Sequence, residues 1–337
     1  MTDAAKLVEL VRGDLVESVH RGHVVICDTS GDILAAWGDP KAVIYPRSSC
    51  KMLQALPLVE SGAAAQAGLG VNHLAFACAS HKAAAIHTDL ATSWLESLGL
   101  SADDLRCGPQ IPQDIAARGL LREEFGQPCQ IHNNCSGKHC GFVTLNQTLK
   151  GGSEYTEVDH PVQKAVREAF EEMTGATSPA WGIDGCSAPN FACEIGNLAR
   201  AMAKMAHPTG LGATRKAAIE SLIPAMMAYP ELVDGFGTAT TEFMQAANGK
   251  AAIKTGAEGV YVAILPERGI GIALKIEDGA GRASEAAMAA ILVRLGVVDA
   301  ADPRIDARLN RKQLNRRGIN AAHFQVTDDL YRGGSSL

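Results

Sequence analysis

Residues 254–276 read KTGAEGVYVAILPERGIGIALKI, two apolar runs separated by a short turn. Gly259–Leu265 and Gly269–Ile276 are rich in Val, Ile and Leu, and Pro266-Glu267-Arg268 between them predicts a β-hairpin. A helical pattern from Ala283 to Leu295 follows. This stretch decides the fold because it brings strands back near the end of a chain whose middle is helical.

The first 40 residues predict three more strands, at Leu15–His20, His23–Cys27 and Ile33–Trp37. Helical spacing begins at Ser48 and continues to about residue 247, for example in Ile86–Leu98, Val162–Met173, Asn190–Met205 and Ala213–Met227. Residues beyond 295 show no clear pattern. Strands at both ends around a helical middle predict an α/β (α+β) fold, with one antiparallel sheet built from both chain ends and a helical region inserted. We expect a single domain over residues 1–337, its sheet region at about 1–47 and 250–300 and its helical region at about 48–249.

The composition excludes some partners. Lys and Arg number 31 and Asp and Glu 37, a net charge of −6, so no basic surface for nucleic acid is expected. Gly, Pro and charged residues interrupt every apolar run before it could span a bilayer, and the first residues lack the apolar stretch of a secretory signal. Nine cysteines, an odd number, then indicate thiols in a reducing compartment, and we expect a cytoplasmic protein without membrane or nucleic-acid partners.

Two separated motifs suggest acyl-transfer chemistry. Ser48 and Lys51 are three residues apart at a predicted helix start, which places both side chains on one face, and a Ser-x-x-Lys pair uses its lysine as general base. Lys254-Thr255-Gly256 lies just before the late hairpin, where penicillin-recognising serine enzymes carry such a box on a strand beside the nucleophile. Each motif alone could be a helix cap or a surface lysine. Their occurrence together, in this order, favours a serine nucleophile.

The chain has no convincing equivalent of the middle Ser-x-Asn motif of those enzymes. Instead Ala77-Cys78-Ala79-Ser80-His81-Lys82 ends an apolar, strand-like run. Ser80 could take the place of the middle serine and pair with Lys254, and His81 could orient a partner or be a satisfied histidine. Two lysines that converge on one site would repel each other, so that one of them becomes neutral at pH 7 and can act as a base.

Polar residues crowd two short turns, His132-Asn133-Asn134-Cys135-Ser136-Gly137-Lys138-His139 and Asp184-Gly185-Cys186-Ser187-Ala188-Pro189. Such density points to a binding or catalytic role. A structural zinc site from Cys135, Cys140, Cys186 and Cys193 is one alternative, although these spacings are poor for a zinc knuckle. Buried thiols that only fill the core are another.

Taken together, Arg47 to Lys51, Gln54 to Gly62, His132 to His139, Asp184 to Cys186 and Lys254 to Gly259 resemble the rhizobial-type (class 3) L-asparaginases. The resemblance covers roughly residues 5 to 325 and implies a fold similar to the serine β-lactamases. It implies two Ser-Lys pairs, Ser48 with Lys51 and Ser80 with Lys254. It also implies a Zn²⁺ site from Cys135, Lys138 and Cys186 with Asp184 nearby, substrate contacts from Arg47 and His139, and a homodimer.

The activity implied is hydrolysis of L-asparagine to L-aspartate and ammonia through a β-aspartyl ester on Ser48. The zinc would position the substrate, because the α-amino and α-carboxylate groups of a free amino acid form a natural chelate. Two alternatives stay open. One is another serine amidase or a penicillin-recognising hydrolase, and the other is a non-enzymatic zinc-binding protein that kept the fold.

Overall fold

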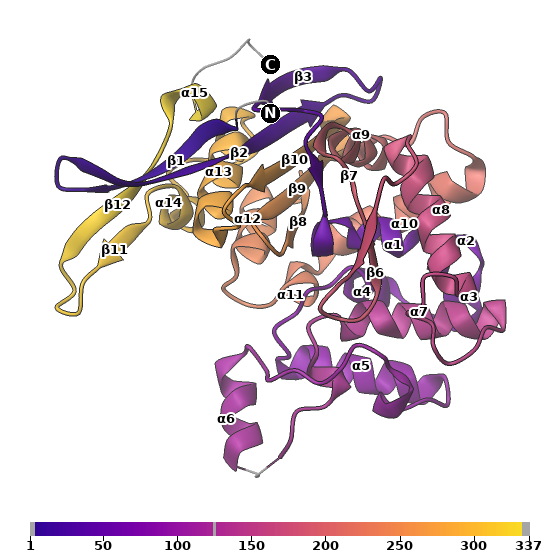
Figure 1. Ribbon diagram of the computed structural model, residues 1–337. Helices are drawn as coiled ribbons and strands as arrows, with labels where there is room; N and C mark the ends of the chain where they lie inside the picture. Colours follow the sequence, from indigo (N-terminus) through magenta and orange to yellow (C-terminus); the bar gives the residue numbers. More distant parts are fainter. Residues whose placement is uncertain (1–3, 124–125, 332–337) are drawn as a thin grey trace. The chain divides into compact units, whose positions relative to one another are not determined.

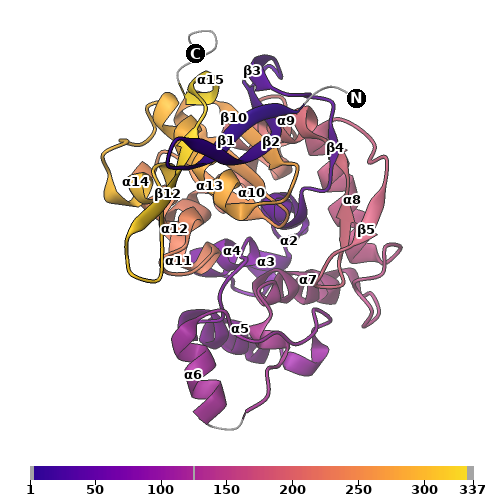
Figure 2. The same cartoon turned by 60° about the vertical axis from the view of Figure 1, so that its left-hand side comes forward.

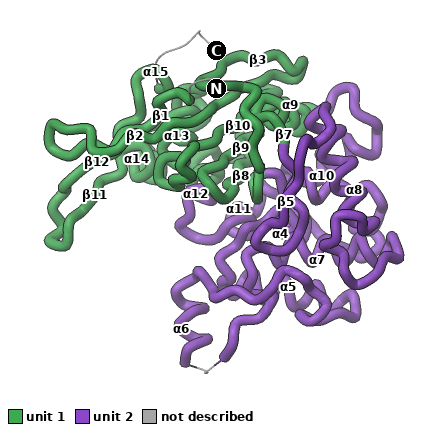
Figure 3. Tube along the Cα trace, viewed as in Figure 1, with its two compact units in different colours: residues 1–49, 193–207, 242–337 green, residues 50–192, 208–241 purple. Residues whose placement is uncertain are grey.

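The computed structural model describes residues 4–123 and 126–331. The chain divides into two compact units, each assembled from separate stretches of sequence (Figure 3). The sheet unit comprises residues 1–49, 193–207 and 242–337, and the helical unit comprises residues 50–192 and 208–241. The sheet unit includes residues 193–207 and 301–337, which lie outside the predicted sheet region at about 1–47 and 250–300. That the two units act as one domain stays a prediction.

An eight-stranded antiparallel sheet forms the sheet unit (Figure 1). Its order is β11-β12-β1-β2-β10-β9-β8, with β3 paired to β2. The strands are β1 (Ala5–Arg12), β2 (Leu15–Cys27), β3 (Ile33–Trp37), β8 (Ala252–Gly256), β9 (Val260–Leu265), β10 (Ile270–Ile276), β11 (Lys312–Leu314) and β12 (Asn320–Val326). The central pairing joins the two chain ends, because Ile272 lies opposite Ile26. The antiparallel sheet built from both ends is therefore confirmed.

Every residue of β9 is buried, so both faces of the central strands are covered. The helices α9 (Ile195–Ala206) and α13 (Gly281–Arg294) pack against these strands. Gly271 makes the contact of β10 with α9 possible, because a Cβ there would collide with the backbone of Ala199 and Ala203. The unit also contains β4 (Val43–Ile44), which pairs with β7 (Cys193–Glu194), the turn η4 (Pro266–Arg268), and the helices α14 (Pro303–Leu309) and α15 (Asp328–Tyr331).

Two strand predictions were incomplete. β1 and the hairpin β11–β12 were not predicted, yet they extend the sheet on the side of β2, where β1, β2 and β12 lie side by side in both views (Figures 1 and 2). The chain beyond residue 295 is therefore not irregular. Its strands are weakly marked because they are short and half exposed; in β12 only Ala322 and Phe324 are buried.

The helical unit is built around α7 (Ser136–Leu149), whose first ten residues are all buried. Helices of the same unit pack against it or against one another: α1 (Lys51–Gln54), α2 (Leu56–Glu60), α3 (Ala63–Gln66), α4 (Val71–Ala77), α5 (Ala85–Ser97), α8 (Pro161–Thr174), α10 (Ala213–Ala228) and α11 (Pro230–Val233). The remaining elements are α6 (Ile115–Glu123), the short turns η2 (Ala102–Asp104) and η3 (Gln130–His132), and the ribbon β5 (Trp181–Ile183) with β6 (Pro189–Phe191). The turn η1 (Arg47–Cys50) and helix α12 (Ala239–Ala247) lie where the chain passes between units.

Two helical predictions need correction. The apolar run before Ser80 is the helix α4 and not a strand; its first backbone groups are capped by the Nδ1 atom of His73, which accepts from the backbone N–H of Gly70 at 3.1 Å. The predicted helix over 190–205 begins only at Ile195, because the residues before it form β6 and β7. No helix among the described residues has the length and apolar character needed to cross a membrane.

Candidate active site

Lys51, the first residue of α1, is completely buried. Its amino group donates to the backbone oxygen of Ala79, to Ser80 Oγ at 3.0 Å and to Cys135 Sγ at 3.2 Å. A charged lysine has three N–H donors and a neutral one has two donors and a lone pair. Neutral Lys51 can keep the bonds to Ala79 and Cys135 and turn its lone pair to the Ser80 hydroxyl. The geometry therefore allows proton transfer between Ser80 and Lys51.

Ser80 is held in place by the backbone on both sides. Its N–H donates to the oxygen of Val233 at 2.8 Å, and the next N–H, of His81, donates to the oxygen of Asn134 at 3.1 Å. The loop after α4 thus runs between the end of α11 and the start of α7. The predicted partner of Ser80 was Lys254; the lysine that bonds it within the helical unit is Lys51, and the pairing with Lys254 stays a prediction.

The sheet unit brings the other two predicted residues together. Ser48 lies in η1, and Lys254 lies, completely buried, on the edge strand β8. A Cβ on Gly256 would lie 2.6 Å from the oxygen of Pro46 and 3.1 Å from the nitrogen of Ser49. Glycine at 256 therefore lets β8 pass directly beside the turn that carries Ser48. The predicted location of the Lys-Thr-Gly box, on a strand beside the serine, is found.

Arg47 has a backbone φ of 54°, in the left-handed region that arginine rarely adopts. The turn is supported by Ser49, whose side-chain hydroxyl donates to the oxygen of Pro46 at 2.7 Å. Such unfavourable backbone geometry persists only where the surroundings impose it, and it clusters at functional sites. Ser48, directly after Arg47, is half-buried.

Cys135 and Cys186 form a hydrogen-bonded thiol pair in the helical unit. The bond from Cys135 lowers the pKa of Cys186 well below its usual value, against the opposing effect of burial. The same bond, together with burial, raises the pKa of Cys135. Cys186 is therefore the thiolate of the pair, and Cys135 is the thiol.

Lys138 supplies the positive charge for this thiolate. Its amino group donates to Cys186 Sγ at 3.0 Å and lies 5.3 Å from the ring centroid of Phe142. Burial lowers the pKa of Lys138, but its electrostatic interactions with Cys186, Cys135 and Asp184 outweigh burial and raise the pKa above its ordinary value. In the absence of a metal ion, Lys138 is an ammonium paired with a thiolate.

The turn between β5 and β6 presents Cys186. The Asp184 carboxylate accepts a hydrogen bond from the backbone N–H of Gly185 at 2.7 Å. The backbone N–H of Ser187, a residue with φ 69°, donates to the backbone oxygen of Asp184 at 2.9 Å. The tight turn leaves Cys186 buried with its sulfur next to Lys138. The predicted second functional turn thus does bring Asp184 and Cys186 to the cluster at the start of α7.

The donor set of Cys135, Lys138 and Cys186 fits a zinc ion chemically. It offers one thiolate, a thiol that can ionise, and an amine. Ligand nitrogen and sulfur atoms of one tetrahedral zinc lie about 3.6 Å apart, so the pair at 3.0 Å has to open by about half an ångström. Within residues 4–123 and 126–331 no three His, Cys, Asp or Glu side chains gather closely enough to hold a metal. The four-cysteine alternative is therefore wrong for the described chain.

His139 is completely buried, and burial lowers its pKa well below the usual value, so the ring is neutral. Its Nδ1 lies 2.8 Å from the hydroxyl oxygen of Tyr155. Sequence reasoning missed Tyr155. The residue stands alone in a polar loop, and no motif marks it.

His81 and Ser136 form a Ser–His pair that resembles a nucleophile with its base. His81 Nε2 lies 2.8 Å from Ser136 Oγ, but His81 Nδ1 accepts from the backbone N–H of Ala83 at 3.0 Å. With Nδ1 as acceptor, the neutral ring carries its proton on Nε2 and donates to Ser136. His81 therefore cannot take the Ser136 proton, and the pair is structural.

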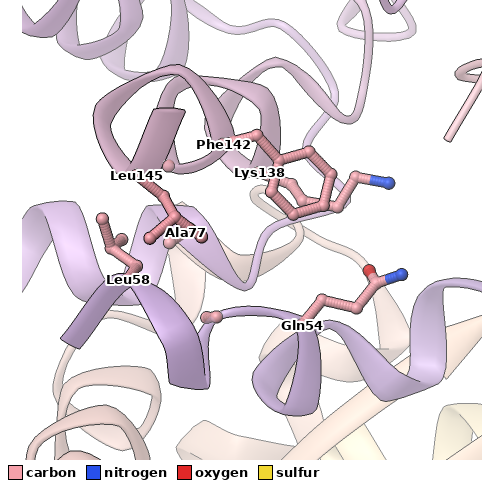
Figure 4. A pocket seen from close by; sticks show the side chains of 8 residues that line it. Gln54, Leu58, Ala77, Lys138, Phe142 and Leu145 are labelled. Atoms are coloured by element: carbon pink, nitrogen blue, oxygen red, sulfur yellow. The ribbon is translucent and has the colours of Figure 1, made fainter. Parts of the chain in front are cut away.

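A small cavity lies beside Lys138 and is lined by residues of α1, α2, α4 and α7 (Figure 4). Leu58, Ala77 and Leu145 form its apolar side, and the polar ends of Gln54 and Lys138 extend away from them (Figure 4). The apolar stem of Lys138 thus packs in the core while its amino group reaches Cys186.

The chain is similar in fold to several solved structures. Mglu in its tris and glutamate form has a TM-score of 0.47 and 14% identity, covering 88% of this chain and 64% of Mglu. The β-lactamase Mb2281c from Mycobacterium bovis has a TM-score of 0.40 and 12% identity, covering 78% and 89%. D-alanine carboxypeptidase AmpC from Burkholderia cenocepacia has a TM-score of 0.40 and 13% identity, covering 85% and 93%.

The chain spans about two thirds of Mglu in its native form, 66% of that chain. No curated protein sequence matches it. A family model does: the one described as L-asparaginase II matches residues 8–326, nearly the whole sequence. This confirms the family resemblance of the motifs around Ser48, Cys135, Cys186 and Lys254, and the chain belongs to the L-asparaginase II family.

Proposed function

We propose that this protein is an amidohydrolase that converts L-asparagine and water to L-aspartate and ammonia. The observation that carries the proposal is the buried amino group of Lys51, bonded to both Ser80 Oγ and Cys135 Sγ. One lysine thus touches a candidate proton carrier and a candidate metal ligand. Membership of the L-asparaginase II family supports the substrate class.

In the proposed reaction Ser48 Oγ attacks the side-chain carbonyl carbon of asparagine. Its proton passes to neutral Lys51, directly or through Ser80, whose hydroxyl lies 3.0 Å from the lysine nitrogen. When the C–N bond breaks, the lysine returns this proton to the departing NH₂ group, which leaves as ammonia. Water then adds to the β-aspartyl ester, giving up a proton to the lysine, and the ester oxygen takes a proton as Ser48 is restored. Lys254, completely buried on β8 beside the Ser48 turn, is the second lysine of the proposed reaction.

Substrate is held through its α-groups in this proposal. Arg47 and His139 contact the substrate, and Cys135, Lys138 and Cys186 hold a zinc ion with Asp184 beside them. Bound zinc would offer open positions to an amino group and a carboxylate. The lysine ligand must be neutral to bind, which sets a pH dependence on loading. In this proposal the protein sets the distance between the groups that hold the α-amino and α-carboxylate groups of the substrate and the Ser48 hydroxyl.

A coupled ammonia assay tests the proposal. Asparagine should release ammonia, and folded Ser48→Ala should release none above background. Glutamine is one methylene longer, about 1.5 Å, and should be at least about 100-fold poorer in kcat/KM because an anchored substrate misplaces its amide. Exposed Ser93→Ala is the matched control and should keep wild-type rates.

The result can also reject the proposal. Turnover of a β-lactam but not of asparagine would identify a penicillin-recognising hydrolase. Zinc binding with no ammonia release from any small amide would leave the non-enzymatic alternative. Full activity of Ser48→Ala would move the nucleophile to another residue, and Ser80→Ala would then be the variant to measure.

We also propose a homodimer in the cytoplasm. Large apolar side chains are exposed on two hairpins of the sheet unit: Leu15 is 71% and Val16 43% exposed on β2, and Leu314 is 63% exposed on β11. Such a patch supports a subunit contact. All nine cysteines are free thiols, which supports a reducing compartment. Light scattering of the purified protein measures the assembly directly, and a monomer would contradict it.

A further inference from the structure

The imidazole of His139 stands in the first turn of α7 with no exposed surface. Its ring makes edge contacts with Phe142 and Tyr155, both at 5.5 Å between centroids. Lys138, Cys135, Lys51 and Asp184 all act on it electrostatically. The ring therefore lies within reach of the same charged cluster that the proposed reaction uses.

One side of the ring is fixed by Tyr155. The Tyr155 hydroxyl oxygen accepts a 2.7 Å hydrogen bond from the backbone N–H of Arg106, and it lies 2.8 Å from His139 Nδ1. The donor from Arg106 is a main-chain group and cannot change its role. The remaining hydrogen of the Tyr155 hydroxyl is then free to point to His139 Nδ1.

Two proton arrangements are possible, and they differ in how many buried groups they leave unpaired. If Tyr155 donates to Nδ1, the proton of the ring is on Nε2, and only that N–H lacks a partner in the described structure. If Nδ1 carries the proton instead, both the Tyr155 hydroxyl hydrogen and the Nε2 lone pair lack partners. Each unpaired buried group costs free energy, so the first arrangement is favoured.

His81 shows what a satisfied ring looks like in the same unit. Its Nδ1 also accepts a hydrogen bond, from the N–H of Ala83, but its Nε2 has Ser136 Oγ at 2.8 Å. His139 Nε2 is a buried nitrogen with no such partner.

Two other buried histidines, His20 and His87, also have an unpaired ring nitrogen. In each of them the other nitrogen faces an oxygen acceptor, on Asp278 or on the backbone of Glu231, so the unpaired nitrogen carries no proton in the neutral ring. His139 differs because its unpaired nitrogen is the donor in the favoured arrangement.

We propose that Tyr155 is a positioning residue that holds His139 as its Nε2–H tautomer, so that Nε2 donates to a carboxylate oxygen of the bound amino-acid substrate. This inference rests on the proposed function. A carboxylate is the fitting acceptor because it has no hydrogen to compete with the donor.

The direct test is the tautomer. Nitrogen NMR of protein labelled with ¹⁵N-histidine should show His139 protonated on Nε2, its signal assigned by its loss in His139→Gln. In Tyr155→Phe the ring should become a mixture of both tautomers or turn to the other one. A wild-type ring protonated on Nδ1, or a signal unchanged by Tyr155→Phe, would overturn the proposal, whatever the enzyme's activity proves to be.

Kinetics test the consequence for substrate. Tyr155→Phe should raise KM for asparagine about 10-fold or more, the size expected for a lost hydrogen bond to a charged group, and change kcat less. His139→Gln keeps an amide N–H near the Nε2 position and should bind substrate better than His139→Asn. Adding Tyr155→Phe to His139→Gln should then have no further effect, because no tautomer remains to be fixed.

The control is Tyr229→Phe, which removes a hydroxyl from a tyrosine that is 41% exposed and should leave KM unchanged. Equal thermal midpoints for the variants and wild type exclude a folding defect as the cause. A Tyr155→Phe enzyme with wild-type KM, or an undiminished effect of Tyr155→Phe in the His139→Gln background, would contradict the positioning role. A wild-type protein inactive on asparagine would reject the proposed function, while the NMR result would still decide the tautomer.

Discussion

The sheet unit and the helical unit bury different kinds of side chain. In the sheet unit the central strands β9 and β10 carry fully buried aliphatic residues such as Val262, Ile272 and Leu274. In the helical unit, Lys51 and His139 are just as completely buried, and most of the buried polar side chains of the described chain lie in this unit. Apolar burial stabilises by about 25 cal/mol per Å², whereas burial of a charge costs free energy unless it is paired.

The difference separates stability from function. Apart from the Ser48 turn and Lys254, the sheet unit buries mainly apolar side chains that stabilise the chain, whereas the helical unit buries polar groups for chemistry at some cost in stability. Replacing buried polar groups by apolar residues of similar volume is often neutral or stabilising when no charged partner is left unpaired. Removing a buried polar side chain from the helical unit should therefore lower activity more than stability. Removing a buried aliphatic side chain from the sheet unit should lower stability more than activity.

Lys51→Met should give the largest change. We expect kcat for asparagine to fall by at least about 1000-fold, because the base and the nucleophile act as one unit, while the thermal midpoint stays the same or rises. Lys164→Met, at an exposed position of α8, is the matched control. Steady-state kinetics and calorimetry measure both quantities, and substantial residual turnover in Lys51→Met would break the comparison.

Leu274→Ala should do the reverse. Removal of this fully buried side chain from β10 should lower the free energy of unfolding by about 2–5 kcal/mol, while kcat per folded molecule stays unchanged. Leu120→Ala, at a side chain that is 58% exposed, should cost no more than about 0.5 kcal/mol. Denaturant titration gives the two values. A loss of kcat in folded Leu274→Ala would show that the sheet core also controls the chemistry.

Cys186→Ala tests the proposed role of the Cys186 thiolate as a zinc ligand. Bound zinc should be lost, and KM for asparagine should rise about 10- to 100-fold with a smaller change in kcat. Cys140→Ala is the control, because its buried sulfur is hydrogen-bonded to the backbone oxygen of Ala91 at 4.0 Å and is not a member of the proposed ligand set. In wild type, zinc affinity should increase with pH, since Lys138 and Cys135 must lose protons to bind. Metal analysis that finds zinc retained in Cys186→Ala would reject the ligand set.

Asp302→Ala should have the smallest effect, about 1 kcal/mol, because Asp302 caps α14 by accepting from the backbone N–H of Arg304 at 2.9 Å. Hydrogen bonding from the Arg304 side chain lowers the pKa of Asp302 to about 2. The charged cap is therefore fully present above the unfolded pKa of about 3.9 and is lost as pH falls through about 2. Asp302→Asn keeps a neutral cap and should show no such loss. Urea titrations at pH 7 and at pH 2 distinguish them.

The outline of the fold could be predicted from sequence, and its edges could not. β3 and α10 begin at the predicted residues, and the hairpin β9–β10 is found, because long apolar runs with clear turns mark them. β11 and β12 were missed because β11 is an edge strand of only three residues and β12 buries only one face. The run before Ser80 was misread because the six apolar residues 74–79 fit either a helix or a strand, and the tertiary contacts that decide between them are not local.

The site could be predicted as residue types but not as hydrogen bonds. Spacing alone marked Ser48, Lys51 and Lys254, and a dense polar turn marked Cys135 and its neighbours. The bond from Lys51 to Ser80 joins residues 29 apart, and that from His139 to Tyr155 joins two elements with no shared motif. Such contacts depend on tertiary packing, which no periodicity encodes.

Because β2 pairs with β10, an amino-terminal strand must wait during synthesis for a strand made near the end of the chain. Ile26 emerges early, but its partner Ile272 follows after roughly 250 further residues, which takes about 12–50 s at 5–20 residues per second. During that time Val24–Cys27 can pair with β3 but lack their central partner β10, whereas most of the helical unit is already synthesised. Expression should therefore depend on chaperones that shield the nascent amino-terminal strand, and a chain truncated before β10 should aggregate.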